Sequence, residues 1–220
     1  MSRCFVVLGA GRFGQLAVTR LADRHGAGAI TVVDDQPDER AFATTSAIQS
    51  VRAEGIDYLS EQLPGLPPES IIVPAIPVHV AFEWLLRDLA PDGPVERAPV
   101  PDDLGLPNES TGPTGDRYVS YADFLCPDDC PEPKNACPVT RTRRGTPMHR
   151  RIAELSCPTL PVHCIRSEQL APGVGGYAVA RLLELRQTLA GLAGTALVGT
   201  ACSCHGVVSA LRRLPSKSTA

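Results

Sequence analysis

Three cysteines lie close together in the middle of the sequence, and each is followed by proline. Cys126, Cys130 and Cys137 are separated by three and six residues. Thiolates bind zinc and iron–sulfur clusters, and a proline after the ligand stiffens the chain that leaves it. Neither the ferredoxin spacing nor paired zinc-ribbon spacing is present. The segment predicts a metal centre, with an iron–sulfur cluster (4Fe–4S) preferred to zinc and oxidisable thiols as the alternative. Cys157 precedes a further proline.

A second pair of cysteines, Cys202 and Cys204, follows an apolar run near the C-terminus. We expect this pair to lie between a strand over 195–198 and a helix over 206–214. A helix N-terminus lowers the pKa of a thiol and favours the thiolate that binds metal. One of the two is therefore predicted to complete the cluster, and the sequence leaves open which one. His205 is a further candidate ligand or neighbouring group.

A glycine-rich motif near the N-terminus matches the pattern G-x-G-x-x-G. Gly9, Gly11 and Gly14, with Arg12 and Phe13 between them, follow an apolar strand over 3–8 and open a helical pattern over 13–24. In that context the glycines permit a tight turn, close approach of a pyrophosphate, and close packing of the helix on the strand. The pyrophosphate would then lie at the positive end of the helix.

The next apolar run, 30–33, ends in two aspartates, Asp34 and Asp35. Asp34 follows Gly14 by 20 residues, where an acid accepts hydrogen bonds from the adenosine ribose. A carboxylate there repels a 2′-phosphate, so the motif favours NAD(H) over its phosphorylated form. The alternative is a strand–helix turn that binds no ligand.

Strands and helices alternate at both ends of the chain, and this alternation predicts how the glycine motif and the cysteines are positioned. Such alternation implies a parallel sheet covered by helices. We therefore expect one doubly wound parallel, Rossmann-like α/β sheet interrupted by a Pro/Cys-rich insert. Loops at the carboxyl edge of such a sheet bind ligands, so the glycine turn and the second cysteine pair should meet there. The expected parts are a dinucleotide-binding half (1–90), a Pro-rich linker with a cysteine-rich insert (91–160), and a βαβα segment that completes the sheet (161–220).

The stretch from Gly9 to Gly14, followed by a strand ending in aspartate, resembles the TrkA-N or RCK-type NAD-binding domain of potassium-transport regulators. The resemblance extends from residue 3 to about residue 90, and the tetrapeptide Gly11-Arg12-Phe13-Gly14 is particularly similar to that family. It implies a domain that senses NAD(H) and regulates a partner. The cysteine-rich remainder is not matched to that family.

The overall composition limits the classes of function. A formal net charge of −3 and a sequence pI of about 5.9 argue against a general nucleic-acid binder. The longest apolar stretch, 71–86, is too short and too polar for a transmembrane segment, and no secretory signal is visible. We expect a cytoplasmic protein, where clustered cysteines are more often metal ligands than disulfides.

Three hypotheses follow from the sequence. The first is a cytoplasmic NAD(H)-binding iron–sulfur redox protein, an oxidoreductase or a subunit of one, which transfers electrons or senses redox state. The second is an NAD(H)-sensing regulatory module whose insert is stapled by zinc and docks a partner. The third is a small NAD-dependent dehydrogenase. The expected partner is a redox protein or a second copy of the chain.

Overall fold

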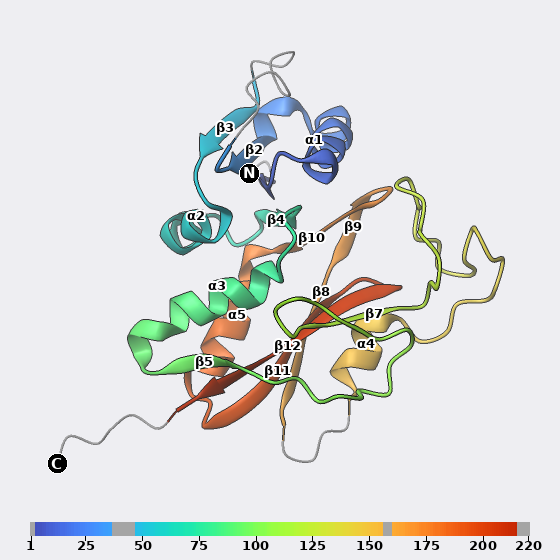
Figure 1. The fold of residues 1–220 in the computed structure, drawn as a ribbon. Helices are drawn as coiled ribbons and strands as arrows, with labels where there is room; N and C mark the ends of the chain where they lie inside the picture. The colour runs from blue at the N-terminus through green and yellow to red at the C-terminus, as the bar shows by residue number, and fades with distance from the viewer. Residues whose placement is uncertain (1–2, 37–46, 156–159, 215–220) are drawn as a thin grey trace.

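The computed structural model describes residues 3–36, 47–155 and 160–214, and it contains two mixed β-sheets (Figure 1). The strands of the first sheet run in the order β3-β2-β1-β4-β10-β9. The second has the order β6-β7-β12-β11-β8, and β5 also pairs with β12. The first-sheet strands are β1 (Phe5–Leu8), β2 (Ile30–Asp34), β3 (Gln49–Arg52), β4 (Ile71–Pro74), β9 (Glu168–Ala171) and β10 (Val174–Ala178). The second-sheet strands are β5 (Val95–Ala98), β6 (Ser110–Thr111), β7 (Arg117–Ser120), β8 (Val162–Arg166), β11 (Gly194–Ala201) and β12 (His205–Arg213).

Helices cover the two sheets and also fill the space between them. The helices α2 (Gly55–Gln62), α3 (Val80–Leu89) and α5 (Val179–Ala190) contribute to one apolar cluster that includes residues of both sheets. Figure 1 shows α3 and α5 between the sheets. Helix α1 (Arg12–His25) covers the other face of the first sheet, and α4 (Met148–Ala153) covers the other face of the second. Short 3₁₀ turns occupy 27–29, 63–65 and 90–92.

The apolar run of β1 is continuous because both faces of the first sheet are buried. Val6 and Leu8 belong to the cluster between the sheets, whereas Phe5 and Val7 pack under α1. A strand covered on both faces has no polar side, as is usual for parallel strands. Cys4, which precedes β1, is exposed.

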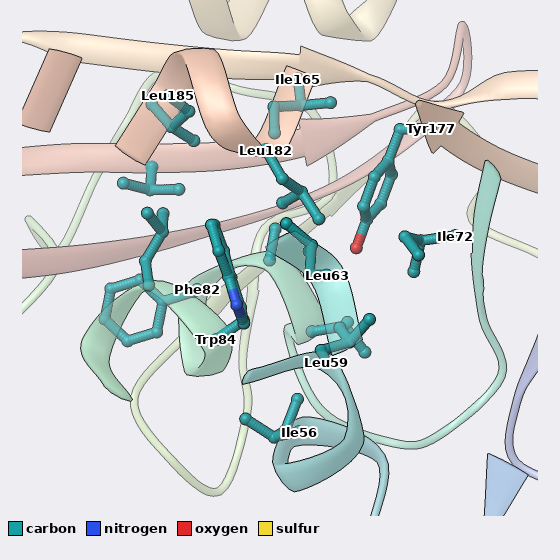
Figure 2. Close-up of a cluster of buried hydrophobic side chains, with 14 of the residues drawn as sticks. Ile56, Leu59, Leu63, Ile72, Phe82, Trp84, Ile165, Tyr177, Leu182 and Leu185 are labelled. Carbon is teal, nitrogen blue, oxygen red and sulfur yellow. The ribbon is translucent and has the colours of Figure 1, made fainter. Parts of the chain in front are cut away.

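The layer between the sheets is held by large side chains from both halves of the chain. Figure 2 shows Trp84 of α3 next to Leu182 of α5, and Ile165 of the second sheet near Leu182. Phe82, Trp84 and Leu182 are at most 1% exposed. Burial of such side chains contributes about 1.5–3 kcal/mol each, so this layer joins the two sheets into one structure.

The prediction of one doubly wound parallel sheet is wrong. Strands β1 to β4 pair in parallel, but β10 pairs antiparallel with β4 and β9 antiparallel with β10. The C-terminal segment adds β9 and β10 to this sheet, but its strands β8, β11 and β12 belong to a second sheet. Alternating strands and helices cannot specify which sheet a strand joins, since that depends on pairing between distant segments.

The helix expected over 206–214 is also wrong, because these residues form β12. Val207 and Val208 are β-branched, which favours a strand. Strand β12 is central in its sheet and pairs with β11, β7 and β5. Residues buried on both faces lose the alternation that marks a strand in the sequence. The Pro-rich stretch expected to be irregular likewise supplies β5 and β6.

A buried polar network also joins helix α3 to the second sheet. Nδ1 of His79, at the start of α3, lies 2.7 Å from Oγ of Ser209 on β12. The Ser209 hydroxyl donates to Asp116, and Arg97 of β5 donates to Asp116 at 2.6 Å and to Glu83 of α3. Since Ser209 donates its proton to Asp116, the His79 ring must donate to Ser209 through Nδ1. Burial lowers the pKa of His79 from 6.5 to about 4, so the ring is neutral in the folded protein.

Within the described residues, the structure has no helix long and apolar enough to cross a membrane.

The His79 network makes stability depend on pH. The unfolded chain takes up a proton at His79 below pH 6.5, but the folded chain does so only near pH 4. Stability is therefore full above pH 6.5 and falls as the pH decreases. We expect the free energy of unfolding, measured by denaturant titration, to fall by about 2 kcal/mol from pH 7 to pH 5 through this group. His79→Asn should flatten this slope, whereas His25→Asn at an exposed position should not. An unchanged slope in His79→Asn would contradict the assignment.

Candidate functional site: a glycine turn beside a cysteine cluster

The glycine turn lies between β1 and α1, as the sequence predicts. A Cβ atom at Gly14 would lie 1.9 Å from the carbonyl oxygen of Gly9, so helix and turn touch through backbone atoms. Gly9 has φ +106, and its N–H donates to the Val33 carbonyl at 2.8 Å. Gly11 is different: its φ is −66, and a Cβ there meets nothing within 4 Å. The fold explains Gly9 and Gly14, but it gives no internal reason for glycine at position 11.

Asp34 lies beside this turn at the end of β2. Its Oδ2 accepts a hydrogen bond from the Ala10 N–H at 2.6 Å, and its Oδ1 accepts one from the Gln36 N–H at 2.8 Å. A carboxylate has about four lone-pair sites, so ribose hydroxyls can still donate to it. Asp34 and Asp35 border a groove of about 690 Å³ between the ends of β2 and β4 and helices α2 and α3.

The groove carries more acid than base. Glu54 and Glu83 line it with the two aspartates, and Arg87 is the basic side chain in its wall. Such a lining repels an additional phosphate group. Of the other predicted nucleotide-binding residues, the Arg12 side chain is 75% exposed and Phe13 is 58% exposed, with the Arg12 guanidinium over the Phe13 ring.

The cysteines gather from two distant segments. Cys126, Cys130 and Cys137 belong to the loop between β7 and α4, and Cys202 and Cys204 to the turn between β11 and β12. The expected meeting at the edge of a single sheet is wrong, because the glycine turn and the β11–β12 turn belong to different sheets. The loop between β7 and α4 connects the two regions instead. Cys157 lies outside the described residues.

His205 and Arg144 lie among these thiols. The Cys126 Sγ is 3.4 Å from Nε2 of His205, and the Cys202 Sγ is 3.7 Å from its Nδ1. Arg144 donates a hydrogen bond to the Cys204 Sγ. The Cys202 Sγ accepts from the backbone N–H groups of Cys204 and His205, both at 3.3 Å. In the β11–β12 turn, the Cys202 sulfur therefore contacts the backbone of the turn, and the Cys204 sulfur contacts Arg144.

The pKa values of the thiols reflect burial and mutual repulsion. Burial raises the pKa of Cys126, and the charges of Cys130 and Cys137 raise it further. Burial raises the pKa of Cys204 to about 11, although Arg144 opposes the rise, and it raises that of Cys202 too. The expectation of lowered pKa values at the second pair is wrong, because these residues lie in a partly buried hairpin turn and not at a helix N-terminus. Hydrogen bonding to Thr140 lowers the pKa of Cys137.

The thiols are close enough to interact, but they do not form a single-ion site. Within the described ranges, no group of three or more His, Cys, Asp or Glu side chains is arranged to hold one metal ion. A zinc ion at 2.3 Å from each sulfur keeps the sulfurs about 3.8 Å apart. The arrangement is therefore not that of a preformed zinc site.

The glycine turn and the cysteine loop touch at Asp128, which lies between Cys126 and Cys130. Arg12 forms an ion pair with the Asp128 carboxylate. Arg20, two turns further along α1, donates to the Asp128 carbonyl at 2.7 Å. The sequence assigns no role to Asp128, and it places Arg144 in a basic run that is either a solvated loop or a docking site for an acidic partner or an anionic substrate. Their signals were an acidic pair between two cysteines and a basic run, and neither pattern is specific.

Comparison with known proteins places the chain in a family. Residues 81–214 match the model of the AF_1314_C family, described as "Uncharacterized protein, C-terminal domain". The chain is also 32% identical, over 222 residues, to an "Uncharacterized protein" of Archaeoglobus fulgidus, an alignment that covers 94% of this chain and 99% of that protein. The chain belongs to the AF_1314_C family. No solved structure matches it.

The resemblance to potassium-transport regulators is therefore wrong. The chain matches the AF_1314_C family and not the TrkA-N domain. The glycine motif and the aspartate at the end of β2 do not identify that family, because they mark only a local unit of strand, turn, helix and strand. Sheets of different overall topology can contain the same unit.

The surroundings of Gly14 and Gly11 predict that replacement by alanine lowers stability by different amounts. Gly14→Ala should lower the free energy of unfolding by about 2 kcal/mol or more, because its Cβ overlaps a backbone oxygen. Gly11→Ala should cost less than about 1 kcal/mol, since its Cβ meets open space and alanine is only a poorer N-cap. Denaturant titration of both variants measures the difference, and equal losses would contradict this account of the turn.

Proposed function

We propose that this protein is an NAD(H)-binding iron–sulfur redox protein that links the redox state of the nicotinamide to that of a cysteine-bound cluster, by electron transfer or by sensing. The observation that carries the proposal is the contact at Asp128. This residue lies between two of the clustered cysteines and is held by Arg12 of the glycine turn. A nucleotide bound at the turn would therefore lie next to the thiols.

Three features support a dinucleotide at the turn. Gly11 leaves open space where a pyrophosphate approaches the backbone, and the first N–H groups of α1 point out of the helix end there. The four parallel strands have the order β3-β2-β1-β4, the order around the first strand of open dinucleotide-binding sheets. The acidic groove beside Asp34 favours NAD(H) over its 2′-phosphorylated form.

The donor set supports an iron–sulfur cluster. Soft thiolate ligands select iron–sulfur clusters, zinc and Cu(I), and five thiols from two distant segments gather here. Arg144 Nε is buried and has no hydrogen-bond partner in the part of the chain that the structure describes. Cluster sulfur is a hydrogen-bond acceptor, so it would satisfy this donor. Cluster assembly must release the thiol protons, because burial keeps Cys126 and Cys204 protonated.

The expected partner is part of the same proposal. A redox protein of this kind exchanges electrons or a signal with a second redox protein or a second copy of itself. Leu125, adjacent to Cys126, is 97% exposed. A partner that binds beside the thiols would cover this side chain.

The nucleotide part of the proposal predicts a specific binding defect. Calorimetry should show NADH bound more tightly than NADPH, and Gly11→Ala should weaken NADH binding at least about tenfold, or about 1.4 kcal/mol. Gly28→Ala, whose Cβ also meets open space, is the matched control and should bind normally. Equal NADH affinity in both variants would contradict a pyrophosphate at the turn.

The cluster part of the proposal predicts iron and sulfide in protein purified without oxygen. We expect a brown protein with about four of each per chain, whose visible absorbance decreases with dithionite. Cys130→Ser should lose most of the iron, and Cys164→Ser, on β8, should keep it. A colourless protein without iron and sulfide would overturn this part. Stoichiometric zinc in its place would support the alternative of a zinc-stapled module that senses NAD(H).

A further inference from the structure

We infer that the nicotinamide end of the bound dinucleotide contacts the cysteine segment 125–130, while the adenosine end occupies the acidic groove. This inference rests on the proposed function, since it assigns the two ends of a ligand that the glycine turn would bind. It makes the loop between β7 and α4 a part of the nucleotide site.

The adenosine side of the site is fixed by Asp34 and Glu54. Asp34 ends β2, and Glu54 follows β3 and accepts hydrogen bonds from the first N–H groups of α2 at 2.9 Å. Both strands lie on the same side of β1 in the sheet. A ribose held by Asp34 therefore directs the adenosine half toward β2 and β3.

The opposite side of β1 leads to the cysteines. There the order continues through β4, β10 and β9. Because β10 is antiparallel to β4, with Ala178 opposite Ile71, the first residues of β10 lie toward the carboxyl end of β4. The turn between β9 and β10 therefore lies at the same edge of the sheet as the glycine turn.

The cysteine segment is fastened to the turn between β9 and β10. The Gly173 N–H donates to the Cys130 carbonyl at 3.0 Å, and the Gln169 side chain donates to the same oxygen at 2.7 Å. Gly173 has φ +66, and a Cβ there would lie 1.7 Å from the carbonyl oxygen of Asp128. Figure 1 shows the yellow-green loop beside the tip of β9.

Helix α1 holds the same segment from its other side. Arg20 donates to the carbonyl groups of Asp128 and Pro172, so one side chain joins the helix, the cysteine segment and the β9–β10 turn. Arg12, at the first position of α1, pairs with the Asp128 carboxylate. A pyrophosphate at this helix end thus lies between the acidic groove and the cysteine segment. A dinucleotide binds across such a crevice with its two halves on opposite sides of it.

Hydrogen exchange with three ligands tests this placement in the full-length protein as purified without oxygen. NADH should slow exchange about fivefold or more both at residues 9–15 and at residues 125–130. ADP-ribose, which lacks the nicotinamide, should slow exchange at 9–15 only. AMP, which lacks the second phosphate and second ribose of ADP-ribose, should not slow exchange at 125–130 either.

A matched pair of glycine variants tests the fastening of the segment. Gly173→Ala should remove the NADH-dependent protection of 125–130 and keep that of 9–15, because its Cβ displaces Asp128. Gly105→Ala has nearly the same backbone strain, with φ +67, but its Cβ meets nothing within 4 Å. It should retain both protections.

The outcomes separate the two levels of the argument. If NADH protects 9–15 but not 125–130, or if ADP-ribose protects 125–130 as well as NADH does, the placement of the nicotinamide is wrong and nucleotide binding at the turn still stands. If NADH protects neither segment, the proposed function is wrong, and the placement is wrong with it.

Discussion

The two sheets of this protein depend on one shared layer of buried helices. Helices α3 and α5 pack with one face against the first sheet and with another against the second, so neither sheet has a complete core without the other. Strands covered on both faces need an apolar partner on each side. The network of His79, Ser209 and Asp116 adds directional hydrogen bonds between α3 and the second sheet, where the packing is otherwise apolar.

The candidate site exists because this arrangement brings the cysteines of the second sheet near the edge of the first sheet that carries the glycine turn. The β11–β12 turn carries Cys202 and Cys204, and the long loop from β7 carries the other three thiols back to α1. The contact is narrow and is made by Asp128 and Cys130 against Arg12, Arg20 and Gly173. The ion pair between Arg12 and Asp128 is largely exposed, so by itself it contributes only about 0–1 kcal/mol to stability. The backbone hydrogen bonds and the absence of a side chain at Gly173 therefore determine where the segment lies.

The chemistry of the site follows from burial more than from local backbone electrostatics. The thiols at the hairpin turn have raised pKa values because they are removed from water, and Arg144 lowers the pKa of Cys204 only in part. Thiols with raised pKa values beside an arginine would have to release their protons in order to bind a metal. The glycine turn differs, because Asp34 is already held in place by a hydrogen bond from the Ala10 N–H.

The sequence by itself determined the local units: the strand, glycine turn and helix from Phe5 to His25, and the aspartate at the end of β2. These features depend on neighbours in the chain, so periodicity and glycine spacing reveal them. Only the tertiary structure decided that β12 is a strand, that β10 runs antiparallel to β4, and that Asp128 meets Arg12. Each of these features depends on contacts between segments up to about a hundred residues apart. The free energy of such contacts comes from surfaces that meet only in the folded protein, so local sequence patterns do not reveal them. The residue types of the site were therefore visible in the sequence, but the geometry that joins them was not.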